Sequence, residues 1–447
     1  MLLRIALVGG LALSSSACTP GATSSRPNLL VIVADDLGCR DLGVYGDLWD
    51  NPAPPPTPTI DRLASDGVRF ERMHANPTCS PTRVTLVYGI YSHRVGIGGI
   101  VKPTDEVDTP STAFTSAATW LGRQGYSTSY FGKWHLSAGE DPEALSRKPL
   151  QHGFDEYLAG SVNQKNHYFD WERSDDGAVS TEAVYSPAAQ ATACRDWIRA
   201  RDEAGPWLAF LSFDAPHSPI HIPPPSSLPA GYRVHNSPRG WYDAMIAALD
   251  FEIGRVLEVV DWTNTTVVFL SDNGPGKEAT LPAQDPERIK GTLYREGIVV
   301  PFLVAGFGVE RPGTSCSALA NTADLFATLA ELAGAPIDPA DVTTAPDSVS
   351  LAPYLAAPER ESLRTWALSE RFGPNGPAPH RSNRRALITE RYKYLRLNEA
   401  EEFYDLDADV NERIDLTTRD LSSEQAEELA RHRSLLESKV GPYSWRR

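Results

Sequence analysis

The stretch NLLVIVADD, residues 28–36, decides the fold. Its apolar residues are continuous and rich in β-branched side chains, and they stop at two aspartates. A strand that is apolar on both sides has to be buried on both faces, which is typical of the inner strands of parallel sheets. The stretch therefore predicts a buried central strand with carboxylates at its carboxyl end.

Strands and helices alternate outward from this stretch as far as residue 360. Further strands are predicted within 126–135, 205–217 and 265–274, and helices are predicted at 59–67, 111–125, 240–261 and 321–336. This alternation predicts an α/β fold in which a large mixed, mostly parallel sheet is covered by helices on both faces.

Beyond residue 360 the pattern changes. Strand-like segments follow one another without helices between them, which predicts a small antiparallel sheet. A final helix is expected from about Ser422, where Ser422 and Gln425 match a capping box. We therefore expect a main domain at 28–360 and a C-terminal subdomain, a small sheet with one helix, at 361–447.

Residues 1–18 have the pattern of an export signal, with one Arg, an apolar run and then small residues. Two interpretations stay open. The first is a plain signal peptide, which would place the protein in the periplasm or outside the cell. The second is a lipoprotein signal with a lipid anchor on Cys18, typical of an outer-membrane lipoprotein. A linker is expected at 19–27, and no later segment predicts a membrane span.

Charge and cysteine usage exclude some functions. The formal net charge of −16, without clusters of Lys and Arg, argues against a nucleic-acid partner. Beyond Cys18, the cysteines are scattered singly and form no zinc-binding pattern. They are Cys39, Cys79, Cys194 and Cys316. One or two disulfides would fit, but for Cys194 and Cys316 the simpler interpretation is a buried free thiol.

Polar side chains stand at the ends of several predicted strands. The pairs are Asp35 with Asp36, Asp272 with Asn273, Lys133 with His135, and His217 with His221. Turn formation alone would explain an isolated Asp or Asn. Ligands of open α/β sheets bind beyond the carboxyl ends of the strands, however, and the repeated occurrence indicates a site there. Carboxylate and amide oxygens predict Ca²⁺ or Mg²⁺ rather than zinc.

The stretch CSPTR, residues 79–83, predicts an anion site at the start of a helix. Pro81 suits the first turn, and Ser80 is the expected N-cap. Cys79 then lies at the helix N-terminus, where free N–H groups favour an anion, and Arg83 can turn back toward it. A thiolate fits poorly beside a hard cation, so residue 79 is expected to present oxygen.

Six motifs, in this order, resemble those of the type I sulfatases of the alkaline phosphatase superfamily. They are VADDLGCRD (33–41), CSPTR (79–83), GKWHL (132–136), APHSP (215–219), LSDNG (270–274) and KGTLYREGIVVP (290–301). The resemblance implies an alkaline-phosphatase-like fold and an arylsulfatase-like activity on sulfate monoesters. It also implies one bound Ca²⁺, with Mg²⁺ as an alternative, and conversion of Cys79 to formylglycine by a formylglycine-generating enzyme. Cys39, beside the first motif's aspartates, is expected to pack rather than to bind metal.

The resemblance also implies roles for individual residues. The metal ligands would be Asp35, Asp36, Cys79 (as formylglycine), Asp272 and Asn273. Arg83 and Lys133 would hold the formylglycine. His217 and Lys290 would bind the sulfate and help to protonate the departing alcohol. His135 would be the base that deprotonates the second hydroxyl of the formylglycine hydrate. The reaction would pass through a covalent sulfo-enzyme intermediate. Further candidates for the pocket are His93, Arg94, His167 and His221.

Two other functions remain open at this point. A cation with Arg and Lys would also suit a phosphate or phosphonate ester hydrolase of the same superfamily. A non-catalytic glycan-binding protein on a sulfatase scaffold is the second alternative. The motifs do not distinguish a sulfated glycan from a small aryl sulfate as the substrate.

Overall fold

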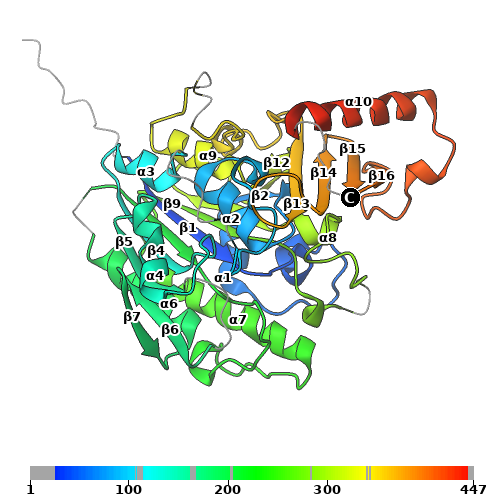
Figure 1. Ribbon diagram of the computed structural model, residues 1–447. Helices are drawn as coiled ribbons and strands as arrows, with labels where there is room; N and C mark the ends of the chain where they lie inside the picture. The colour runs from blue at the N-terminus through cyan, green and yellow to red at the C-terminus, as the bar shows by residue number, and fades with distance from the viewer. Residues whose placement is uncertain are drawn as a thin grey trace, which may run out of the picture.

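A computed structural model of the chain describes residues 26–105, 107, 114–161, 168–201, 205–281, 284–338, 341 and 344–440. Its centre is a large twisted sheet (Figure 1). Among the described residues the strand order is β11 (Thr314–Cys316), β2 (Gly67–Phe70), β10 (Phe302–Gly306), β9 (Thr265–Ser271), β1 (Asn28–Ala34), β8 (Trp207–Ser212), β4 (Ser127–Lys133), β5 (Glu156–Ser161), β6 (Trp171–Asp175) and β7 (Ala178–Glu182). The inner strands β9, β1, β8, β4 and β5 are parallel, and β10, β6 and β7 pair antiparallel to their neighbours.

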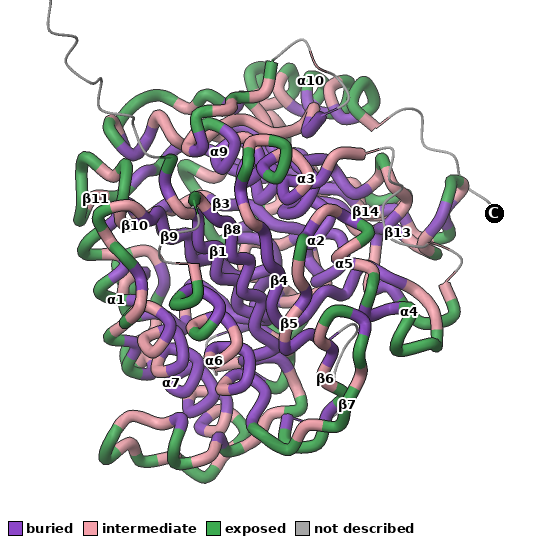
Figure 2. Tube along the Cα trace, turned by 90° about the vertical axis from the view of Figure 1, so that its left-hand side faces the viewer, coloured by how far each residue is buried: buried purple, intermediate pink, exposed green. Residues whose placement is uncertain are grey.

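The strand from the opening stretch explains why helices cover both faces. Successive side chains of a strand point to opposite sides. Leu29, Val31 and Val33 belong to the core under one layer of helices, and Leu30 and Ile32 belong to the core under the other. Every one of these five side chains is fully buried. Figure 2 shows β1 in the buried colour at the centre of the molecule, so the predicted fold is confirmed.

The helices form two layers. One layer contains α2 (Cys79–Tyr88), α3 (Ala117–Gly122) and α9 (Asp324–Leu332), and the other contains α1 (Pro58–Ser65), α6 (Ser186–Arg199) and α7 (Pro238–Leu257). Three shorter helices are α4 (Pro142–Ser146), α5 (Lys148–Gln151) and α8 (Arg295–Ile298). A small parallel pair, β3 (Met73–His74) with β12 (Ala320–Asn321), lies beside the main sheet.

The C-terminal sheet is antiparallel, as predicted. Its strands are β13 (Ala367–Gly373), β14 (Ser382–Ile388), β15 (Tyr392–Leu397) and β16 (Ala400–Asp405), and α10 (Ser423–Val440) packs on it. The expected cap is present, because the Ser422 hydroxyl accepts the Gln425 N–H at 3.2 Å and the Gln425 side chain accepts the Ser422 N–H at 3.0 Å. Figure 1 shows this sheet and α10 at one side of the molecule.

Some predicted elements differ from the structure. The helix expected at 111–125 begins at Ala117, because Ser116 caps it by accepting the Thr119 N–H at 3.0 Å. The helix expected at 240–261 begins two residues earlier, at Pro238, and ends at Leu257. Strands β6 and β7 were not predicted, because their side chains are mostly polar or half-buried and show no apolar run.

The structure also answers the cysteine question within its described part. Cys39, Cys79, Cys194 and Cys316 are all buried free thiols, so the alternative of one or two disulfides is wrong for these four. The Cys39 thiol packs against the Val299 carbonyl, with 3.7 Å between sulfur and oxygen. Cys18 and the expected signal lie outside the described residues. Among the residues described, no helix is long and apolar enough to cross a membrane.

Candidate active site

Strands β1 and β9 bring the predicted metal ligands together. The two strands are parallel and in register as far as Ala34 and Ser271, so the aspartates that follow each strand are neighbours. The Asp36 N–H donates to Oδ1 of Asp272 at 3.3 Å, and Nδ2 of Asn273 donates to Oδ1 of Asp36 at 2.7 Å. Asp35, Asp272 and Asn273 are fully buried, and Asp36 is 4% exposed. These four residues form one cluster of oxygen donors at the edge of the sheet.

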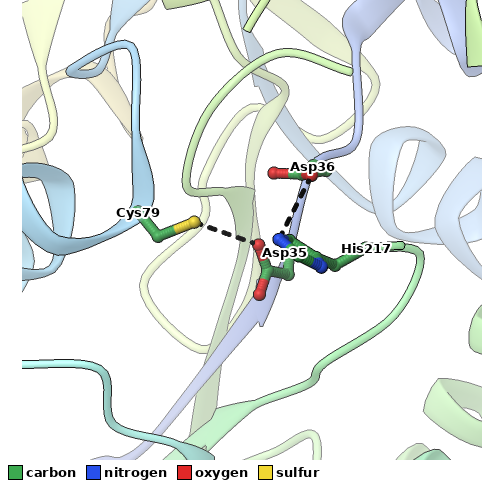
Figure 3. A group of neighbouring side chains, drawn as sticks. All are labelled: Asp35, Asp36, Cys79 and His217. Atoms are coloured by element: carbon green, nitrogen blue, oxygen red, sulfur yellow. Dashed lines mark hydrogen bonds and ion pairs between the residues drawn. The ribbon is translucent and has the colours of Figure 1, made fainter. Parts of the chain in front are cut away.

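Helix α2 delivers residue 79 to this cluster. The helix begins at Cys79 itself, and its N-cap is Thr78. The expectation that Ser80 is the N-cap is therefore wrong, because the Ser80 hydroxyl accepts the Val101 N–H at 3.0 Å instead. The Cys79 sulfur lies 3.5 Å from Oδ1 of Asp35 (Figure 3). Residue 79 thus lies at the helix N-terminus and next to the cluster of oxygen donors.

Two ammonium groups approach residue 79. Lys133, at the end of β4, and Lys290, in the segment before α8, each place Nζ 3.6 Å from the Cys79 sulfur. Lys133 also pairs with Asp35, and Lys290 with Asp36. Burial alone would lower the pKa of each lysine, but the neighbouring carboxylates outweigh it and raise the pKa of both. Both lysines therefore remain positively charged.

Arg83 lies on the carboxylate side of the site. Its side chain is buried, and it donates to Oδ2 of Asp272 at 2.9 Å and to the Ser212 hydroxyl at 2.6 Å. A further bond to the Lys133 carbonyl, at 2.5 Å, ties α2 to the end of β4. Arg83 is thus a fixed countercharge that orients the loops around residue 79.

Both predicted catalytic histidines are buried. His217, in the loop after β8, places Nε2 3.7 Å from Oδ2 of Asp36 (Figure 3). Its Nδ1 lies 2.6 Å from the Ser218 carbonyl and so bears the proton. His135 has a positive φ of 56° and a buried Nδ1 without a hydrogen-bond partner among the described residues. Burial, reinforced by the charge of Lys133, lowers the pKa of both rings, which favours their neutral forms.

The carboxylates differ in their electrostatics. Burial would raise the pKa of Asp35, but the positive charges of Lys133 and Arg83 outweigh it and hold that pKa well below its ordinary value. For Asp272, burial and then the charge of Asp35 raise the pKa to about 6. Burial first, and then Asp272 and Asp35, also raise the pKa of the Cys79 thiol, so an unmodified cysteine here is protonated.

The donor set fits a hard cation. Asp35, Asp36 and Asp272 offer carboxylate oxygens, and the buried Oδ1 of Asn273 has no hydrogen-bond partner among the described residues. A buried amide oxygen without a partner is rare and indicates an absent ligand. One ligand atom each of Asp35, Asp36, Cys79 and His217 also lies within 4.8 Å of the others. Oxygen donors of this kind suit Ca²⁺, and next Mg²⁺.

The C-terminal sheet holds the segment that bears Lys290. Glu412 is buried, and its carboxylate accepts the Arg295 N–H at 3.0 Å and the Lys393 ammonium at 2.5 Å. The Glu412 carbonyl accepts from Arg288 at 2.5 Å. Residues on both sides of Lys290 are thereby fastened to the loop after β16. Sequence reasoning missed Glu412, because no local pattern connects positions more than 100 residues apart.

The additional pocket candidates have different outcomes. His93 Nδ1 contacts Glu370 at 2.9 Å, and Arg94 pairs with Asp347 at 2.6 Å, so both are engaged in contacts with later parts of the chain. His167 lies outside the described residues. The His221 ring packs on Tyr168, with 4.2 Å between ring centroids.

Comparison with known proteins agrees with this geometry. The family model "Sulfatase" matches residues 27–335. Mouse arylsulfatase J is 30% identical over 340 residues, which are 71% of this chain and 54% of that protein. The arylsulfatase of Klebsiella aerogenes is 25% identical over 430 residues, covering 71% of this chain and 88% of that protein. The chain thus spans about half the length of mouse arylsulfatase J.

Solved structures share the fold. Ps i-CgsB, in complex with k-i-k-neocarrahexaose, has a TM-score of 0.78 at 23% identity, with 94% of this chain and 95% of that chain covered. The structure of BT4656 in complex with its substrate D-glucosamine-2-N,6-O-disulfate has a TM-score of 0.71 at 20% identity, with 93% of this chain and 98% of that chain covered. Because the family model matches residues 27–335, which are more than half of the chain, the chain belongs to the sulfatase family, as the motifs predicted.

Proposed function

We propose that this protein hydrolyses sulfate monoesters, with formylglycine at position 79 and one Ca²⁺ as the metal. The observation that supports this most directly is the surroundings of residue 79. Its side chain lies 3.5 Å from a carboxylate oxygen of the metal cluster and 3.6 Å from each of two ammonium groups. A group that lies between a cation site and two lysines is placed to react with an oxyanion whose oxygens are bound by the cation and by the ammonium groups.

Asp35, Asp36, Asp272 and Asn273 would hold the Ca²⁺, which supplies Lewis-acid polarisation of a sulfate oxygen when bound. Formylglycine supplies an oxygen nucleophile, which suits a hard cation better than the sulfur of cysteine does. Helix α2 adds its free N–H groups on the same side, where the positive end of the helix dipole favours an anion. Mg²⁺ would fit the same donors, so the identity of the ion is open to direct measurement.

The remaining steps fall to this chain's own side chains. Lys133 would hold the formylglycine and Lys290 would bind a sulfate oxygen, since both are charged and both face residue 79. Nε2 of His217 faces the site, and a sulfate bound beside this ring would favour its protonated form and allow it to protonate the departing alcohol oxygen. His135 is neutral and buried, and it would accept the proton that is released when the aldehyde of residue 79 re-forms.

Two measurements test this proposal. Mass spectrometry of the peptide that contains residue 79 should show formylglycine when the protein is made together with a formylglycine-generating enzyme. The modified protein should then hydrolyse 4-nitrophenyl sulfate faster than 4-nitrophenyl phosphate, and Cys79→Ala should be folded and inactive. An unmodified cysteine in fully active protein, or a preference for the phosphate ester, would refute the proposal.

A further inference from the structure

Four aromatic rings form a cluster beside the loop after β8, which bears His217. They are Tyr168 and Phe169, before β6, Tyr185, at the N-terminus of α6, and His221, in the loop after β8. We call them the aromatic cluster. Phe169 stacks on Tyr185 with 5.2 Å between centroids and meets the edge of His221 at 5.4 Å. Tyr168 packs on His221 at 4.2 Å.

The aromatic cluster is bonded directly to the loop that bears His217. The buried Tyr168 hydroxyl lies 2.6 Å from the carbonyl oxygen of His217 and 2.8 Å from that of Asp214, and these two oxygens share its one hydrogen. His221 follows His217 by only four residues. If the rings face solvent, the rest of a ligand whose sulfate lies beside His217 would therefore be able to contact them.

Part of the cluster does face solvent. Phe169 is 44% exposed, and Ile222, next to His221, is 49% exposed. These two are among the few large apolar side chains that are exposed in the described part of the chain. Exposed apolar surface costs about 25 cal/mol per Å², so apolar side chains gathered beside a catalytic centre indicate a ligand-binding surface.

Polar atoms at the cluster favour a sugar over a purely apolar ligand. Nε2 of His221 lies 3.3 Å from the Tyr185 hydroxyl, which is a long and therefore weak hydrogen bond. Nδ1 of the same ring is held by the Pro219 carbonyl at 2.8 Å, which fixes Nε2 as an acceptor. A sugar ring offers an apolar C–H face to the aromatic rings and a hydroxyl that can donate to such an acceptor, whereas a hydrocarbon offers no donor to it.

We propose that the aromatic cluster binds a sugar ring of a sulfated saccharide substrate, with Phe169 as the stacking residue. This assignment rests on the proposed sulfatase function and names the class of its substrate. The rings would hold the sugar by stacking while the sulfate lies between residue 79, Lys290 and His217.

The test compares Phe169→Ala with Phe307→Ala. Phe307 is also exposed, at 38%, but it follows β10 next to the start of β9, at the opposite end of the sheet from Asp272. The probes are sulfated glucosamine, chondroitin sulfate disaccharides and carrageenan oligosaccharides, with 4-nitrophenyl sulfate as the small ester. Phe169→Ala should lower kcat/KM for the best saccharide about tenfold, mainly through KM, the size expected for loss of one stacked ring. Hydrolysis of 4-nitrophenyl sulfate should change by less than about twofold, Phe169→Trp should retain activity on the saccharide, and Phe307→Ala should resemble the unchanged protein.

The outcomes separate this inference from the proposed function. If Phe169→Ala leaves saccharide hydrolysis unchanged, or lowers both kinds of ester equally, the aromatic cluster is not a sugar platform, although the protein is still a sulfatase. The same holds if the protein cleaves 4-nitrophenyl sulfate but cleaves every saccharide of the panel more slowly. If modified protein cleaves no sulfate ester at all, the proposed function itself fails, and the sugar platform fails with it.

Discussion

Replacing Lys290 by alanine tests the electrostatics of the site most directly. In the proposed mechanism the Cys79 sulfur marks the place of the reacting oxygen, and Nζ of Lys290 lies 3.6 Å from this sulfur. At that separation and an effective dielectric constant of about 20, a full unit charge interacts with the ammonium by about 5 kcal/mol. If about half a charge develops in the transition state, Lys290→Ala should lose about 2.5 kcal/mol, which is roughly a hundredfold in kcat/KM.

The assay is turnover of 4-nitrophenyl sulfate at saturating Ca²⁺, on protein whose formylglycine content has been measured. Lys277→Ala is the matched control, because Lys277 lies in the same connection between β9 and α8 but is 57% exposed and pairs with the exposed Glu287. Calorimetric Ca²⁺ titration of both variants separates a loss of charge from a loss of metal, since Lys290 also pairs with Asp36. Our reasoning is wrong if Lys290→Ala keeps more than about a third of the activity, or if Lys290→Gln is as active as Lys290→Arg.

Two further predictions concern the metal and the stability of the fold. Ca²⁺ at a hundredfold above its Kd should stabilise the protein by about 2.7 kcal/mol in thermal unfolding, and EDTA should reverse the effect. Asp272→Asn should abolish this stabilisation. An unchanged response of the variant to Ca²⁺ would contradict the assignment of Asp272 as a ligand. Burial would raise the pKa of Glu370, but His93 and Arg385 outweigh it and lower that pKa from 4.5 to about 2. The ionised carboxylate therefore contributes about 3 kcal/mol of stability above pH 4.5, and this contribution is lost as the pH falls toward 2. The free energy of unfolding, measured in urea, should be higher for the unchanged protein than for Glu370→Gln, and this difference should shrink by about 1.5 kcal/mol from pH 7 to pH 3.5. The control Glu399→Gln, at an exposed position, should have the same free energy of unfolding as the unchanged protein at both pH values.

Much of the fold and the site could be predicted because the signals are local. The run at 28–36 defines a strand that is buried on both faces, and its end at Asp35 marks the edge where ligands bind. The parallel register of β1 and β9 then places Asp272 beside Asp36, as the two strand ends together predicted. An apolar run and its terminal carboxylate are adjacent in the chain, so no knowledge of distant contacts is needed.

Features that depend on distant contacts could not be predicted in this way. Ser80 has the side chain of a good N-cap, but the Val101 N–H competes for its hydroxyl, and the sequence gives no sign of that partner. Arg83 was expected to turn toward residue 79, but the sequence did not predict its bonds to Asp272 and Ser212, each more than 100 positions away. The same applies to Tyr168, whose bond to the His217 carbonyl depends on how two loops meet.

The bonds between Glu412 and the residues flanking Lys290 determine how far the chain can be truncated without loss of support for the site. The recognisable family segment stops at residue 335, yet one of its lysines is steadied from position 412. The shortest active fragment is therefore expected to be longer than the segment that the family model matches. Transplanting residues 27–335 onto another protein would carry over all of the reactive groups while leaving one of them without its support.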